Sequence, residues 1–483
     1  MIINNRTFRG GYLFDKFKGE PDQKLVETGP PGKACVPLKQ GFGEEVQPEV
    51  RVGDTVSAGQ IIGRNDENLS SPVHSPIAGI VKSIASGVIN IESSGENTEG
   101  KWKALPGFSA EWQNLDRNIL EDLVYLSGAS GLDSGGIPTR YMSSPITSEE
   151  VENIIIHNTE ADLFSPLTDV LLQGPRGEEF AGGCLILDKL FPKARKHIVV
   201  SRKNRKIIEQ FETTFKGNDS FEFYAVKPKY PANLEEVLVP AILGKPFPYG
   251  FGAVNIGVVV LSFQTVLHVY QAVAQGKPVI ERIISLGGER FTENLHARVR
   301  VGTTVEALIK GRIKEGENRY IFNSINTGVR VKDLSLPVDR SISSVIAIPD
   351  EKAGESMSFA RPGFIKDSYS YTFASVIPLF KKGLNTNVHG EKRACISCGF
   401  CEEVCPVRIL PNLLHKYVEK NIIEETLANY KIFNCIDCNL CTYVCTSKIG
   451  VASLIKLGKE KLRADGVDNG EFIRKNFALK GIH

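Results

Sequence analysis

The sequence contains no long uninterrupted hydrophobic run. A transmembrane helix needs about 18 or more nearly continuous apolar residues. The best candidate, residues 257–274, is interrupted by Gln264, His268 and Gln271. Its first part, residues 256–261, instead predicts a buried strand that leads into an amphipathic helix. We therefore expect no membrane-spanning segment.

Excess charge of one sign is also lacking. The formal net charge is +2, and the lysines are scattered among acidic residues instead of forming a basic stripe. Nucleic-acid binding requires such a stripe, so we expect no nucleic-acid partner. Residues 1–11 lack the apolar core of a secretory signal, and we therefore expect the reducing cytoplasm as the compartment.

What the sequence does contain is a normal globular composition and many cysteines. Of its 483 residues, 42% are hydrophobic and 24% are charged, which is typical of folded protein. The length predicts about three or four domains. Ten cysteines in a reducing compartment favour metal binding over disulfides.

An N-terminal region over residues 30–94 consists of short apolar runs separated by Gly, Asp, Asn, Ser and Pro, which predicts a small all-β module. Residues 50–63 and 71–84 resemble the barrel-sandwich fold of biotinyl and lipoyl domains. Those domains carry a prosthetic group on a lysine at a hairpin tip, but the corresponding turn, residues 74–79, has no lysine. We therefore expect a structural module, with His74 as a hydrogen-bonded surface residue.

Residues 115–276 alternate between apolar runs of strand length and helix-like stretches, which predicts an α/β sheet with crossover helices. The expected strands are residues 153–157, 197–200, 221–226 and 255–261, and the expected helices are residues 181–190, 206–215 and 233–243. A smaller β-rich unit is expected over residues 277–346, followed by an extended or helical link over residues 362–384.

Eight cysteines form two runs with the same C-x2-C-x2-C-x3-C spacing. A [4Fe-4S] cluster needs four thiolates, and the two-residue gaps let one tight loop reach three of its irons. In bacterial two-cluster ferredoxins the fourth thiolate comes from the last cysteine of the other run. We therefore predict two clusters, one held by Cys395, Cys398, Cys401 and Cys445, the other by Cys435, Cys438, Cys441 and Cys405.

Zinc is the alternative to iron and sulfur. It usually takes its four thiolates from two separated C-x2-C pairs, a layout that two complete four-cysteine runs do not fit. Pro406 follows the first run, whereas Thr446 follows the second, where the common motif has proline. We expect this difference to change the local backbone geometry and the reduction potential of the cluster without removing a ligand. Apolar residues between the runs recur at helical spacing and predict a helical ferredoxin module. Cys35 and Cys184 are expected to be buried apolar thiols.

Taken in order, these features resemble the C subunit of the Rnf complex, a membrane-bound ferredoxin:NAD+ oxidoreductase that couples electron transfer to sodium or proton pumping. The resemblance runs nearly end to end, through the lysine-free barrel, the segments GGIPT at 135–139, KYP at 229–231 and GKPVIER at 276–282, and both cysteine runs. The A subunit of the sodium-translocating NADH:quinone reductase is a relative, and residues 388–393 (VHGEKR) are similar to it. That subunit lacks the clusters, so the cysteines favour the Rnf side.

The resemblance implies a site for FMN and NADH in the α/β domain, with a glycine-rich loop that cradles phosphate. Its residues would be Gly128, Gly131, Gly135, Gly136, Thr139, Glu160, Asp162 and Lys229. The loop departs from the family pattern at Leu132 and at Asp133, whose carboxylate would repel a phosphate. Residues 232–235 (ANLE) replace a Gln-Gly-Gly-Glu segment. Both flavin binding and a flavin-free docking platform are compatible with these departures.

The resemblance also implies a multidomain α/β plus β fold. Its units would be an N-terminal barrel-sandwich (lipoyl-like) module over 1–110, a Rossmann-like α/β nucleotide or flavin domain over 111–276, a small SLBB-type β-grasp unit over 277–346, a linker over 347–384 and a helical domain with two [4Fe-4S] clusters over 385–483.

Three functions remain open at this point. The first is an oxidoreductase subunit of an Rnf-like complex, peripheral on the cytoplasmic face of the membrane, which relays electrons between NAD(H), flavin or ferredoxin and membrane subunits. The second is an iron-sulfur relay and scaffold without its own NADH site. The third is a quinone-reductase subunit, although no residues mark a quinone pocket.

An apolar stripe over 451–472, interrupted by Gly458, predicts either docking to a partner or packing within the cluster module.

Overall fold

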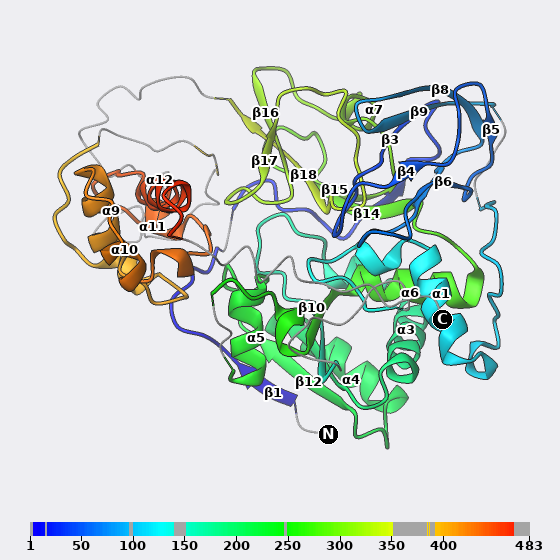
Figure 1. Cartoon of the computed structure of the whole chain (residues 1–483), viewed down its shortest axis with the longest axis horizontal. Coiled ribbons are helices and arrows are strands. Elements are labelled where there is room, and N and C mark those ends of the chain that lie inside the picture. The colour runs from blue at the N-terminus through cyan, green and yellow to red at the C-terminus, as the bar shows by residue number, and fades with distance from the viewer. Residues whose placement is uncertain are drawn as a thin grey trace.

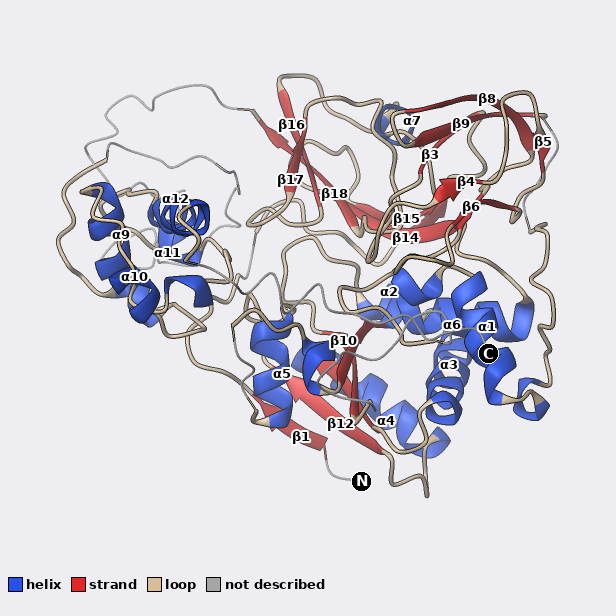
Figure 2. Cartoon of the chain, in the orientation of Figure 1, coloured by secondary structure: helices blue, strands red, loops and turns tan. Residues whose placement is uncertain are grey.

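Four structural units follow the colour gradient in Figure 1. Two β-rich units, blue and yellow-green, lie together at the top, the α/β unit lies below them, and the helical unit, orange to red, lies at the left. Figure 2 shows that this left unit consists of helices and loops. The computed structural model describes residues 3–14, 17–95, 100–139, 151–245, 249–350, 384, 386 and 392–467. Most of the linker expected over 347–384, and residues 388–391 and 468–472, lie outside this description.

The N-terminal module consists of two small antiparallel sheets, as predicted. One has the strand order β3-β9-β8-β5 and the other β4-β6-β7. Along β8 and β9, Val81, Ile89 and Ile91 are fully buried, whereas Ile80 and Lys82 are exposed. This alternation arises because one face of the pair covers the core and the other meets solvent. The strands are β3 (Lys33–Pro37), β4 (Gln47–Pro48), β5 (Thr55–Val56), β6 (Ile61–Arg64), β7 (Val73–His74), β8 (Gly79–Ala85) and β9 (Val88–Ser93).

A five-stranded parallel sheet forms the centre of the α/β unit, in the order β1-β12-β11-β10-β13. Ile154, Ile155 and Ile156 are consecutive and all fully buried, because helices cover both faces of the sheet. The strands are β10 (Asn153–Asn158), β11 (Arg195–Ser201), β12 (Phe221–Val226) and β13 (Val258–Ser262), and the helices are α1 (Arg117–Leu126), α2 (Thr168–Leu171), α3 (Arg176–Leu190), α4 (Arg205–Thr214), α5 (Glu235–Leu243) and α6 (Phe263–Gln275). The predicted strands and helices overlap β10 to β13 and α3 to α5.

Two short strands near the N-terminus join sheets other than those of the barrel module. β1 (Ile3–Arg6) is the edge of the α/β sheet and pairs with β12. β2 (Leu25–Glu27) is the edge of the third unit's sheet and pairs with β15. The expected module over 1–110 does not anticipate this, because strands this short and partly polar carry no clear alternation.

The third unit is a mixed six-stranded sheet in the order β17-β16-β18-β14-β15-β2. It is formed by β14 (Glu281–Gly287), β15 (Leu295–Arg300), β16 (Asn318–Phe322), β17 (Val329–Val331) and β18 (Ser344–Pro349), with the short helix α7 (Val305–Ile309). Gln264 of α6 ties this sheet to the α/β unit, because its amide accepts from the backbone N–H of Ile283 at 3.0 Å and donates to the carbonyl of Ile283 at 2.8 Å.

Arg340 joins the barrel module to the third unit. Its guanidinium donates to the carbonyl oxygens of Pro72 at 2.7 Å and Val279 at 3.2 Å, and lies 3.0 Å from Nδ1 of His74. Arg340 is 2% and His74 1% exposed. The expectation that His74 is a surface residue was therefore wrong, because an arginine distant in the sequence covers it. Cys35 and Cys184 are buried free thiols, as predicted.

The C-terminal module has two similar halves. α8 (Phe400–Glu403) lies within the first cysteine run and α9 (Pro411–Glu419) follows it, whereas α11 (Leu440–Tyr443) lies within the second run and α12 (Val451–Ala464) follows it, with α10 (Thr426–Asn429) between the two halves. Val451, Ile455 and Leu462 lie buried in the core of this module. The described part of the apolar stripe thus packs within its own module. Among the helices described in the whole chain, none has the length and apolar character needed to cross a membrane.

Candidate redox sites

The first cysteine site is a small cavity near the module surface. It is lined by Cys395, Cys398 and Cys401 of the first run and by Cys445 of the second. Left-handed backbone at Ser397 (φ 55°) and Gly399 (φ 80°) wraps the loop tightly around it. The backbone N–H groups of Ser397 and Ile449 point at the sulfurs of Cys395 and Cys445, each at 3.4 Å. Cys398 is exposed, so this site opens to solvent.

The second cysteine site repeats this geometry in the other half of the module. Cys435, Cys438 and Cys441 of the second run and Cys405 of the first line a cavity. Left-handed backbone recurs at Asp437 (φ 54°) and Asn439 (φ 63°), each 40 residues (435 minus 395) after its counterpart in the first loop. Cys405 and Cys441 are buried. The structure thus brings three cysteines of each run together with the last cysteine of the other.

Both sites have the donor chemistry of an iron-sulfur centre. Burial raises the pKa of Cys401 to about 12 and that of Cys435 to about 11. As free thiols these groups would stay protonated, whereas a bound metal centre displaces the proton and holds the thiolate. Four sulfurs around each cavity, with backbone N–H groups beside them, fit a [4Fe-4S] cluster.

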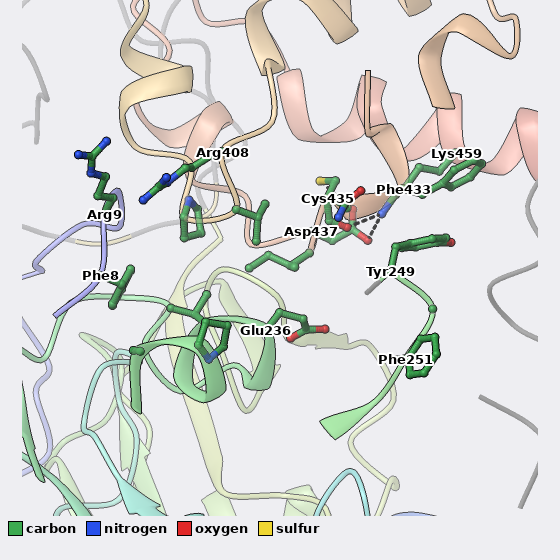
Figure 3. A pocket seen from close by; sticks show the side chains of 18 of the residues that line it. Phe8, Arg9, Glu236, Tyr249, Phe251, Arg408, Phe433, Cys435, Asp437 and Lys459 are labelled. Carbon is green, nitrogen blue, oxygen red and sulfur yellow. Dashed lines mark hydrogen bonds and ion pairs between the residues drawn. The ribbon is translucent and has the colours of Figure 1, made fainter. Parts of the chain in front are cut away.

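Among the described residues, a buried lysine lies beside the second cysteine site and not beside the first. Nζ of Lys459, on α12, donates to the carbonyl oxygen of Cys435 at 3.0 Å and to Oδ2 of Asp437 at 2.6 Å. These residues border a cleft of about 970 Å³ between the helical module and α5. Figure 3 shows Glu236 of α5 on one side of this cleft and Cys435, Asp437 and Lys459 on the other. The cleft also contains a stacked aromatic pair, Tyr249 and Phe433, whose ring centroids are 5.3 Å apart.

The N-terminal segment and Tyr230 contact the helical module on the side of the α/β unit. The backbone N–H of Gly11 donates to the carbonyl of Val404 at 2.8 Å. Tyr230 is fully buried and packs with Val404, Leu440 and the partly buried Cys438. Burial raises the pKa of Tyr230 well above its usual range, and the nearby Asp162 and Cys438 raise it further. Tyr230 therefore lies close to both Cys438 and Asp162.

The cavity that contains Asp162 lies at the point where the strand order of the parallel sheet reverses, and we call it the switch-point cavity. Its volume is about 330 Å³, and its walls come from residues that follow β10 and β13 and from the third unit. In α/β sheets, ligands bind in the crevice at the carboxyl ends of the strands where the order reverses. Glu160 lines this cavity and accepts from the backbone N–H and the hydroxyl of Thr168, both at 2.7 Å. Burial raises the pKa of Asp162 to about 7, and the Ser324 hydroxyl, which donates to it at 3.0 Å, opposes this rise.

The switch-point cavity contains polar atoms that lack a partner within the described residues. They are Nδ1 of His157, Oγ1 of Thr159, Oδ1 of Asn233, and Nε and Nη1 of Arg282. Buried polar groups are almost always hydrogen-bonded. A cavity with this many unmet donors and acceptors fits a polar ligand such as a flavin nucleotide.

Two glycines of the glycine-rich loop, by contrast, face Arg340 of the third unit and the barrel module. A Cβ on Gly128 (φ 82°) would lie 2.3 Å from Nη1 of Arg340, and one on Gly131 would lie 2.9 Å from the side chain of Ser71. These glycines therefore allow units to pack closely. Among the described residues that line the switch-point cavity there are none of the predicted Gly128, Gly131, Gly135, Gly136, Thr139 and Lys229, whereas Glu160 and Asp162 do line it.

Lys229 and Asp133 have contacts that the sequence did not reveal. Nζ of Lys229 donates to the carbonyl oxygens of Phe8 and, at 2.6 Å, of Gly10, so it holds the N-terminal segment. The carboxylate of Asp133 accepts from the backbone N–H of Ser262 at 3.0 Å, at the start of α6. Sequence reasoning also missed Arg282, although it lies within the GKPVIER segment. A charged residue beside a run of apolar strand residues was the available signal.

Three family models match the chain. The RnfC barrel sandwich hybrid domain model matches residues 6–98, the Nuo51 FMN-binding domain model residues 124–271, and the 4Fe-4S dicluster domain model residues 391–449. Among solved structures, that of an NAD+-reducing [NiFe]-hydrogenase in the H2-reduced state matches 76% of this chain and 65% of that chain, with a TM-score of 0.43 and 12% identity.

Curated relatives match nearly the whole chain. The C subunit of the proton-translocating ferredoxin:NAD(+) oxidoreductase complex of Clostridium ljungdahlii is 24% identical over 95% of this chain and 95% of its own length. The C subunit of the ion-translocating oxidoreductase complex of Buchnera aphidicola is 23% identical over 90% of this chain and 85% of its own length. These relatives confirm the predicted resemblance.

Proposed function

We propose that this chain, a homologue of the C subunits of ion-translocating oxidoreductase complexes, relays single electrons between a flavin or nicotinamide and partner subunits. The observation that carries the proposal is the position of the eight cysteines, four around each of two cavities in one helical module. In this proposal the crossed sets are the ligands: Cys395, Cys398, Cys401 and Cys445 for the first cluster, and Cys435, Cys438, Cys441 and Cys405 for the second.

The clusters would supply one-electron carriers, and FMN would exchange two-electron for one-electron chemistry. The chain's residues position these groups and set their surroundings. Glu160 and Asp162 would orient the ligand in the switch-point cavity. Tyr230 and its apolar neighbours exclude water between this cavity and Cys438. Cys398 is exposed, so the edge of the first cluster at this residue would face the next electron carrier.

The relatives' names support membrane partners, and the Clostridium ljungdahlii name adds ferredoxin and NAD+ as redox partners. We place the chain as a peripheral subunit on the cytoplasmic face of a membrane, held there by integral subunits of the complex.

A second candidate is an iron-sulfur relay and scaffold without its own nucleotide site. Asp133 favours it, because its carboxylate already occupies the start of α6, where a helix N-terminus would otherwise attract phosphate. The glycine-rich loop favours it too, because it packs against the barrel.

Anaerobic purification, flavin analysis and a reduction assay test these candidates. We expect bound or titratable flavin, and bleaching of the cluster absorbance by NADH or by reduced ferredoxin. Cluster reduction by another subunit only, with no flavin binding, would support the second candidate. The membrane placement is tested separately: the chain should co-sediment with membranes only when its integral partners are expressed, and binding to protein-free liposomes would contradict it.

A further inference from the structure

Arg282 is a buried cation, two of whose guanidinium nitrogens lack a partner among the described residues. It is the second residue of β14, it is only 7% exposed, and it lines the switch-point cavity. Within the described part of the chain, no hydrogen-bond partner reaches its Nε or Nη1. Buried guanidinium groups are normally paired, because an unpaired charge in a protein interior is strongly unfavourable. Two unmet N–H donors and a positive charge indicate that the missing partner is an anion.

The charged groups around Arg282 do not supply that anion. Burial lowers the pKa of Arg282, and Asp133 and Asp339 oppose this effect through space. Neither acid forms an ion pair with Arg282 among the described residues. Burial lowers the pKa of His268, and Arg282, Lys277 and Arg340 lower it further, so other cations lie near His268.

The start of α6 lies beside β14, because Gln264 of α6 is bonded to the backbone of Ile283. Asp133 is bonded to the backbone N–H of Ser262, and the Ser262 hydroxyl accepts from the backbone N–H of Thr265 at 3.2 Å. These two bonds satisfy donors at the start of α6 that would otherwise bind a phosphate. A phosphate placed there would also meet the Asp133 carboxylate.

We infer that Arg282 binds the phosphate group of a flavin mononucleotide in the switch-point cavity, so that the guanidinium on β14, and not the backbone at the N-terminus of α6, supplies the donors for the phosphate. This inference rests on the proposed function and specifies how its flavin is held. The planar guanidinium can donate two parallel hydrogen bonds to phosphate oxygens. The third unit then supplies the anion-binding group for a cavity whose other walls belong to the α/β unit.

The test is a calorimetric titration of the anaerobically purified full chain, with both clusters intact, using FMN and riboflavin. Riboflavin differs from FMN only in lacking the phosphate. We expect the unaltered chain to bind FMN at least tenfold more tightly, roughly the effect of one charge-assisted interaction. Arg282→Gln should remove this preference and leave riboflavin affinity unchanged. Arg282→Lys should keep part of it, because lysine retains the charge but not the paired donors.

Two further variants make the test specific. Arg298 lies on the neighbouring β15, pairs with Glu27 at 3.5 Å and does not line the cavity, so Arg298→Gln should leave the FMN preference intact. Asp133→Asn should tighten FMN binding several-fold without changing riboflavin binding. Cluster absorbance and the unfolding midpoint report whether each variant is folded.

The outcomes separate this inference from the proposed function. Equal affinity for FMN and riboflavin, or an equal loss of both in Arg282→Gln, would overturn the role of Arg282 while flavin binding stands. Weaker FMN binding by Asp133→Asn would also overturn the proposed source of the phosphate donors. If neither flavin binds the unaltered chain, the inference and the flavin part of the proposed function fail together, while the electron relay through the clusters stands.

Discussion

Lys459 donates a hydrogen bond to the carbonyl oxygen of Cys435, and its side chain is only 5% exposed. The residue at the same place in the first half of the module, 40 positions earlier (459 minus 419), is Glu419, which is 41% exposed and pairs with Lys392. The two halves therefore share a backbone pattern but differ in the charge beside the cysteines. A buried positive charge stabilises the extra electron of a reduced cluster.

We predict that Lys459→Gln lowers the midpoint potential of the cluster at Cys435 by an amount on the order of tens of millivolts. The loss of a buried positive charge makes the reduced state less favourable. Redox titration followed by electron paramagnetic resonance measures the change. Glu419→Gln is the matched control and should shift neither potential appreciably, because solvent screens an exposed charge. An unchanged potential in Lys459→Gln would show that Lys459 is only a packing residue.

Cys445→Ala should damage the cluster site formed by Cys395, Cys398 and Cys401, although it lies far away in the sequence. The reason is that Cys445 completes that cavity. Iron content should fall from about eight to about four or seven atoms per chain, with only one paramagnetic signal altered. Cys184→Ala removes a buried thiol far from both sites and should leave both signals unchanged. Damage confined to the cluster of Cys435, Cys438 and Cys441 would contradict the crossed arrangement.

Arg340→Met should destabilise the chain by roughly 3 kcal/mol or more, because the carbonyl oxygens of Pro72 and Val279 and the His74 ring lose their buried partner. Denaturant unfolding followed by tryptophan fluorescence measures the change. Arg330→Gln is the control, since Arg330 is 49% exposed and its ion pair with Asp350 should contribute only about 0–1 kcal/mol. Equal effects of the two substitutions would contradict the role of Arg340 in joining the units.

Asp162 should make stability fall as the pH rises toward neutrality. Burial raises the pKa of Asp162 to about 7 from its ordinary value of 3.8, so the folded chain holds a proton that the unfolded chain has lost between these values. Stability therefore decreases with rising pH in this window. Asp162→Asn should lack this slope, so the variant should gain stability relative to the unaltered chain as the pH rises from 3.8 to about 7. Parallel pH profiles of the two proteins would show that Asp162 does not titrate there.

Much of the fold could be predicted because it depends on local pattern. Consecutive apolar residues marked β10 to β13, since strands covered on both faces need them. The cysteine spacing marked the cluster-binding loops, because loop geometry around a cluster is local. Apolar residues at helical spacing between the two runs marked the helical module. β1 and β2 could not be predicted, because their positions depend on pairing with β12 and β15, far along the chain.

The flavin-type site was harder to predict, because its residues come from three parts of the sequence. Glycines were expected to approach a phosphate, but Gly128 instead makes room for Arg340, a contact between distant segments. The local signal of Arg282 is limited to its position beside apolar strand residues, because its unmet donors become visible only when β14 and the carboxyl ends of β10 and β13 come together. The repulsive position of Asp133 in the loop was visible in the sequence, but its bond to Ser262 was not.

The central claim is that eight cysteines hold two [4Fe-4S] clusters, and metal analysis of the anaerobically purified chain tests it most directly. Iron, acid-labile sulfide and zinc should be measured on the same sample. We predict about eight iron and eight sulfide per chain, with no stoichiometric zinc. Stoichiometric zinc with no iron would contradict the claim.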